Sequence, residues 1–150
     1  MWRTWRQDDV GQALVEFALL LPMLCFFLIG GIDVARVYAM QLAVQNGARA
    51  GAESAVIGFN LTDAQIATHV QQEMGRTPGM DGYNTANSPP SSACPTLAAG
   101  QNCIYITHPV VSSVTYVKVE VKYAFKTIIT WPLIPTTATL DRTTQFRVFP

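Results

Sequence analysis

One long apolar segment near the N-terminus constrains this chain more than any other feature. Residues 12–32 contain a single charged side chain, Glu16. A helix of this length, at ~1.5 Å per residue, spans roughly the 30 Å hydrocarbon core of a bilayer. Pro22 removes one backbone hydrogen bond, which a membrane helix tolerates. The segment therefore predicts a transmembrane helix over residues 12–32.

Glu16 is out of place in such a helix. A carboxylate at the centre of a bilayer costs at least ~2.5 kcal/mol. The acid must therefore have a partner, or lie at the edge of the span.

A cleaved secretory signal is the alternative interpretation of the same segment. The apolar region of such signals is about 7–15 residues long, and a small-residue cleavage site follows it directly. Here the apolar run is longer. The residues that match such a cleavage site, Ala48-Arg49-Ala50, lie well beyond its end. The pattern favours a retained helix.

The charge balance limits the possible partners. Among 150 residues, ten are basic and ten acidic, so the formal net charge is zero. This balance argues against nucleic-acid binding, which requires a basic surface. Charged residues make up 13% of the chain, against about 25% in ordinary soluble domains. The deficit indicates a membrane anchor followed by a polar, weakly charged domain.

The helix is expected to continue beyond the membrane over residues 33–57, which contain no proline. Small residues recur there at every fourth position, and such a row lets another helix approach closely. It can pack on its own domain or on other subunits, and we expect both. The row consists of Gly31, Ala35, Ala39, Ala43, Gly47, Gly51 and Ala55.

A short second helix is predicted from Thr62 onward. Thr62 and Gln65 form a capping-box pattern, and Leu61 and Ile66 occupy the flanking staple positions. Gly75 is a suitable C-terminal stop. The residues expected on its apolar face are Ile66, Ala67, Val70 and Met74.

A loop over residues 76–102 follows, rich in proline, glycine and small polar residues. Cys94 and Cys103 stand near its end with eight residues between them. They are either a disulfide that staples the loop or two free thiols, and an anchored domain outside the cytoplasm favours the disulfide. Cys25 lies in the apolar run, and His69 and His108 are isolated, so no metal or other cofactor is expected.

Two long strands complete the domain. Apolar and charged residues alternate over residues 114–125, which predicts a half-buried antiparallel strand, and residues 138–149 repeat the pattern. Residues 104–106 predict a short third strand. The fold class is thus α+β: a long N-terminal helix, a short second helix and a small antiparallel sheet.

The connection between the long strands has an unusually apolar tip, and two prolines exclude it from a central strand. It either tucks over the sheet or contacts a partner or the membrane surface. Its apolar residues are Ile128, Ile129, Trp131, Leu133 and Ile134. No catalytic constellation or phosphate loop appears in the sequence, so an enzyme is not expected.

The N-terminus carries a resemblance to known proteins. The pattern around residue 11 resembles the processing site of type IV prepilins. It consists of Gly11, four further residues, Glu16-Phe17 and then an apolar run. The stretch from Gly11 to Pro22 resembles the TadE-like family of tight-adherence (Flp-type) pilus proteins, and the similarity extends to about Ala52. A pilin-like fold is what this resemblance implies.

The resemblance also implies a processing event and a set of partners. A prepilin peptidase would cut between Gly11 and Gln12, releasing residues 1–11 as a leader. Glu16, followed by Phe17, would set subunit register by pairing with the new amine of a neighbouring subunit. The partners would be the peptidase, other pilin or pseudopilin subunits and the inner-membrane assembly machinery.

The same family implies a location. The chain would cross the bacterial inner membrane once, with residues 58–150 in the periplasm or in an extracellular pilus. This domain is larger than the short major pilins of such systems have, which favours a minor pilin or pseudopilin. The alternative is an unprocessed single-span anchor that displays a periplasmic binding module.

Overall fold

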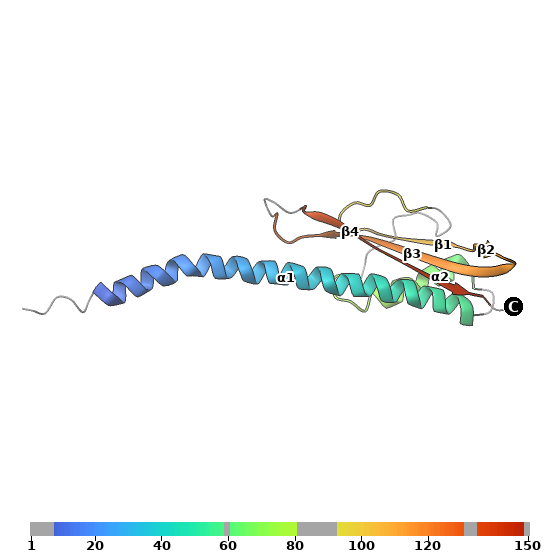
Figure 1. The fold of residues 1–150 in the computed structure, drawn as a ribbon, viewed down its shortest axis with the longest axis horizontal. Helices are drawn as coiled ribbons and strands as arrows, with labels where there is room; N and C mark the ends of the chain where they lie inside the picture. Colours follow the sequence, from blue (N-terminus) through green and yellow to red (C-terminus); the bar gives the residue numbers. More distant parts are fainter. Residues whose placement is uncertain (1–7, 59–60, 81–92, 131–134, 149–150) are drawn as a thin grey trace, which may run out of the picture. The chain divides into compact units, whose positions relative to one another are not determined.

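The computed structural model describes residues 8–58, 61–80, 93–130 and 135–148. Figure 1 shows a long helix, a short helix and an antiparallel sheet, so the predicted α+β class is confirmed. The elements are α1 (Asp8–Ile57), α2 (Asp63–Met74), β1 (Asn102–Thr107), β2 (Val110–Val111), β3 (Val114–Lys126) and β4 (Thr137–Arg147).

The chain forms two compact units, Met1–Arg36 and Val37–Pro150, and α1 runs through the boundary between them. In the first unit the described chain is entirely helical and includes Pro22 within the helix. The second unit contains the end of α1, α2 and the whole sheet.

β3 is the central strand of the sheet. β1 and β4 both pair antiparallel with it, and their shared partners on β3 include Val119 and Val121. The two strands therefore lie on opposite sides of β3. The short β2 pairs with the start of β3 through a tight turn.

The alternation along β3 decides which face of the sheet is covered. Val117, Val119, Val121, Tyr123 and Phe125 are buried, as the sequence predicted. They form one core with the buried residues of α1 and α2, so both helices lie against this face. The helical contribution to that core is Met40, Ala43, Val44, Ala48, Ala52, Ile66, Ala67, Val70 and Met74.

α2 begins as predicted. The backbone N–H of Thr62 donates to Gln65 Oε1 over 2.9 Å, and the Gln65 N–H donates to Thr62 Oγ1 over 3.4 Å. These two bonds satisfy donors that the first helical turn leaves open. The four residues predicted for its apolar face are all buried. Gly75 follows the helix in a right-handed conformation (φ −64°), so the end of α2 does not require a left-handed glycine.

The sequence interpretation missed one strand. β2 and β3 are joined by Ser112 and Ser113, whose φ angles are 51° and 65°. Two positive φ values are typical of the tight hairpin turn that usually uses Asn-Gly. Serine gives no such signal, so the hairpin was not predicted.

Candidate assembly site

The predicted cleavage site lies at the beginning of α1. Gly11 is the fourth residue of the helix, within the turn whose N–H groups lack intrahelical acceptors. A Cβ placed on Gly11 would have no neighbour within 4 Å among the described residues. Packing therefore gives no reason for a glycine at this position.

Glu16 lies one turn after Gln12 on the same exposed surface of the helix. The side-chain amide of Gln12 donates to Glu16 Oε1 over 3.1 Å. Phe17, the other predicted registration residue, is 61% exposed. The carboxylate thus accepts a hydrogen bond from a neutral group.

The apolar run of α1 is exposed over most of its length. Among the described residues, this is the one helix long and apolar enough to cross a membrane, and its most apolar window is not buried by the rest of the chain. Cys25 lies within it as a free, exposed cysteine. The exposed large side chains of the run are Leu14, Val15, Phe17, Leu19, Leu20, Leu21, Met23, Leu24, Phe26, Phe27, Leu28 and Ile32.

The row of small residues divides into two parts. Ala43, Gly47 and Gly51 are buried and Ala55 is partly buried against the core. By contrast, the three residues nearer the N-terminus, Gly31, Ala35 and Ala39, are exposed.

The two buried glycines pack closely on α2. A Cβ on Gly47 would lie 2.7 Å from Cγ of Met74, and one on Gly51 would overlap with Val70. The buried part of the row thus serves α1–α2 packing within the chain.

Polar side chains continue along α1. With its amide oxygen turned toward Arg142 of β4, Gln41 accepts from the guanidinium over 2.6–3.1 Å. One face of α1 is therefore tied to β4 by a polar contact as well as by the core.

Two ion pairs lie along the same helix. Arg36 Nη1 and Asp33 Oδ1 are 3.1 Å apart, and Arg49 Nε donates to Glu53 Oε1 over 2.6 Å. The hydrogen bond from Arg49 to Glu53, and the attraction between the two charges, raise the pKa of Arg49.

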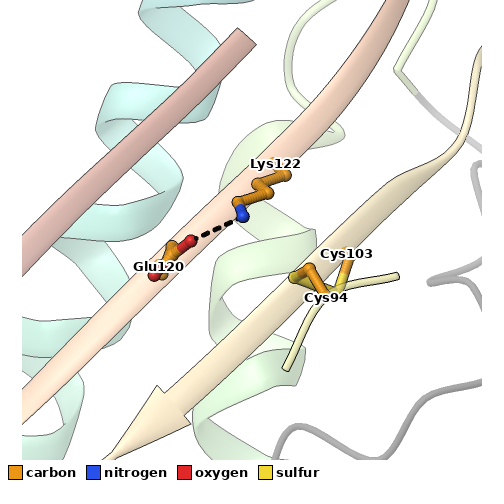
Figure 2. Close-up of a disulfide and its surroundings, with 4 residues drawn as sticks. All are labelled: Cys94, Cys103, Glu120 and Lys122. Carbon is orange, nitrogen blue, oxygen red and sulfur yellow. Dashed lines mark ion pairs between the residues drawn. A yellow bond between two sulfur atoms is a disulfide. The ribbon is translucent and has the colours of Figure 1, made fainter. Parts of the chain in front are cut away.

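The predicted disulfide is present. Cys94 and Cys103 are bonded, with their Cα atoms 5.8 Å apart. Figure 2 shows the bridge beside Glu120 and Lys122, which form an ion pair of 3.0 Å on β3. Cys103 of β1 lies opposite Lys122 of β3. Along β3, Glu120 and Lys122 alternate with the buried valines, so they point to the other face of the sheet. The bridge therefore attaches residue 94 to the sheet face opposite the helices.

The apolar connection after β3 is partly described. Ile128 is 59% exposed, and Ile129 is partly buried. Thr127 stabilises the start of the connection, since its N–H donates to Thr136 O over 3.1 Å and its hydroxyl donates to Ile129 O over 2.8 Å. The other predicted tip residues, Trp131, Leu133 and Ile134, lie outside the described residues.

Sequence reasoning also missed a polar contact between His108 and Asp63. His108 Nε2 lies 2.8 Å from Asp63 Oδ1, which joins the segment after β1 to the first turn of α2. The residues are 45 positions apart, and no local pattern indicates such a pair. His69, in contrast, is exposed on α2.

Comparison with known proteins bears on the N-terminal segment. Residues 11–53 match the family model described as TadE-like protein. The chain matches no curated protein and no solved structure. The match begins at Gly11 and covers the exposed apolar run, Glu16 and most of the small-residue row. The resemblance seen in the sequence is confirmed, and the segment from Gly11 to Glu53 is TadE-like.

Proposed function

We propose that this chain is a minor pilin or pseudopilin-like component of a tight-adherence pilus assembly system. Residues 12–32 would anchor it in the bacterial inner membrane, with the sheet domain in the periplasm. Its role is structural, and no catalysis is assigned to it. The observation that carries the proposal is a TadE-like segment that begins at Gly11 and places Glu16 on an exposed apolar helix.

Processing after Gly11 is supported by the surroundings of that residue. Glycine is a poor helix former compared with alanine, and here no close packing compensates for it. A peptidase that must approach the backbone closely would give the glycine a purpose. Its position in the first turn also favours access, since helix ends fray.

Glu16 supports association between subunits. Within bilayer depth a carboxylate requires a cationic partner. The donor found in the structure is the neutral amide of Gln12. Cleavage would create a positive α-amine at Gln12, and the amine of a neighbouring copy would complete the pair.

The divided row of small residues supports the same assembly. Gly47 and Gly51 are occupied by α2, so they are not available to another subunit. Gly31, Ala35 and Ala39 remain exposed. We assign these three to contacts with neighbouring helices, together with the apolar run. The partners are other pilin or pseudopilin subunits and the inner-membrane machinery.

The test is intact mass after co-expression with a prepilin peptidase of a tight-adherence system. We expect the mature protein to lack residues 1–11, and an inactive peptidase to leave it whole. Gly11→Leu should block cleavage. Gly31→Leu is the matched control, since this glycine is also exposed and has no neighbour within 4 Å of an added Cβ. Only full-length protein with the active peptidase would contradict the proposal and favour an unprocessed anchor.

A further inference from the structure

Two contacts fix how the sheet runs along the end of α1 within the second unit. A Cβ on Gly51 would lie 3.4 Å from Cγ1 of Val119 on β3. Ten residues earlier on the helix, Gln41 bonds to Arg142, and Arg142 pairs with Val121 on β3. β3 therefore runs from the later to the earlier residues of α1 as it approaches its connection to β4.

This direction places the two hairpins at opposite ends of the unit. Figure 1 shows β2 and the start of β3 at one end of the sheet, and the end of β3 with the start of β4 at the other. The β3–β4 connection lies at the end where Val37 begins the unit, and the turn with Val110 and Val111 lies far from it.

The start of β4 also extends past the first helical residue of the unit. From Arg142 back to Thr137, β4 continues for five residues, about 17 Å along a strand. From Gln41 back to Val37, α1 continues for four residues, about 6 Å along a helix. The strand end thus reaches roughly 10 Å further than the helical residues of the same unit.

The residues at this end suit a lipid headgroup region. Lys126, the last residue of β3, is exposed, and Ile128 is 59% exposed two residues later. A cation beside an aliphatic side chain matches an interface that offers both phosphate and the edge of the acyl region. Ile32, the last residue of the apolar run, precedes Val37 by five residues. Only four residues of the sequence separate the end of the run from the start of this unit.

We propose that Lys126 and Ile128 contact the headgroup region of the same bilayer that holds residues 12–32. The inference rests on the membrane anchor in the proposed function. It gives the sheet domain a second point of attachment, so that the domain is held against the membrane before assembly. Extraction of the subunit into a pilus then has to break this contact.

The test uses the full chain in vesicles of phosphatidylcholine and phosphatidylglycerol, with an environment-sensitive fluorophore on one cysteine at a time. Cys25, labelled in the wild-type chain, reports insertion of the anchor. Ile128→Cys in a Cys25→Ser background reports the β3–β4 connection. Val111→Cys in the same background is the matched control, since Val111 is 55% exposed at the opposite end of the sheet. The disulfide protects the other two cysteines from labelling.

A probe about 5–10 Å into the interface lies at headgroup depth, so quenchers attached to the headgroup should lower the fluorescence at position 128. They should leave position 111 unaffected, and Lys126→Glu should reduce the quenching at 128. A Cys25 probe that acyl-chain quenchers reach, together with a 128 probe that headgroup quenchers leave unaffected, overturns this inference and leaves the anchor intact. Shielding at 128 that rises with protein density, without lipid quenching, means a second copy covers the site and also overturns it. A Cys25 probe that acyl-chain quenchers leave unaffected contradicts the anchor and this inference together.

Discussion

Gln12 and Glu16 face one another across one turn of α1, with Nε2 of Gln12 donating to Oε1 of Glu16 over 3.1 Å. A carboxylate has about four acceptor sites. The hydrogen bond from the Gln12 amide satisfies one of them and leaves the negative charge uncompensated. In water this is harmless, but at bilayer depth it is costly. Processing after Gly11 would create a cationic α-amine at Gln12 of each subunit, and the amine of a neighbouring subunit would then supply the counter-charge to Glu16.

Glu16→Gln separates the charge of this residue from its size. The amide keeps the length of the side chain and can still bond to Gln12, but it cannot pair with an amine as an anion. We expect unchanged membrane insertion and loss of pilus assembly, measured by fractionation and by the amount of pili released on shearing. Glu53→Gln makes the same change further along α1, where the carboxylate pairs with Arg49 of its own helix, and this control should retain pili. Normal piliation with Glu16→Gln contradicts the pairing role.

The elements governed by local chemistry were predictable from the sequence. The capping box at Thr62 and Gln65 marked the start of α2 because both bonds lie within one turn. The alternation along residues 114–125 identified the buried face of β3 because side chains in a strand point to alternate faces. The disulfide could be weighed against free thiols because the anchor implies an oxidising compartment.

What the sequence could not give depends on contacts distant along the chain. The row of small residues looks uniform from Gly31 to Ala55, yet only its later members meet α2, because the position of α2 is set by the whole core. The pair of His108 with Asp63 and the contact of Gln41 with Arg142 have the same origin. For the site itself, the pattern identified Gly11 and Glu16, but only the structure showed that Gln12 donates to that acid.

Thr62→Ala should destabilise the start of α2 by about 1 kcal/mol, because it removes the hydroxyl that caps the helix. Hydrogen exchange of the amides in the first turn of α2, measured on the full chain in detergent micelles, should become faster. Thr68→Ala is the control. Its hydroxyl bonds to Ala64 O within the exposed side of the same helix, so the first-turn amides should stay protected. Equal exchange in both variants would contradict the capping role.

Removal of the disulfide should lower the stability of the sheet domain. The bridge closes a loop of about ten residues, which in the chain-entropy account contributes about 2–3 kcal/mol. The double variant Cys94→Ser/Cys103→Ser should therefore unfold at lower denaturant concentration than the oxidised protein, and reduction of the wild type should give the same shift. Cys25→Ser, which leaves the bridge intact, should behave as wild type. A bridge-free domain of unchanged stability would show that residue 94 is held in place by other contacts.

Gly31 and Gly51 belong to the same row, but only the Gly51→Ala substitution should lower the stability of the sheet domain. At Gly51 the added methyl group overlaps with Val70, a fully buried residue of α2, so α1 and α2 must separate. Overpacking costs about 1–3 kcal/mol and the gain in helix propensity offsets about 1 kcal/mol, which leaves a net loss of about 1 kcal/mol. At Gly31 the methyl group meets nothing within 4 Å, so the sheet domain should keep its stability. Denaturation of the full chain in micelles measures both effects.

If Gly31 contacts neighbouring helices as proposed, Gly31→Leu should also reduce pilus assembly while leaving the denaturation midpoint unchanged, because a bulky side chain would hold those helices apart. Full piliation with Gly31→Leu would remove this part of the row from the assembly surface.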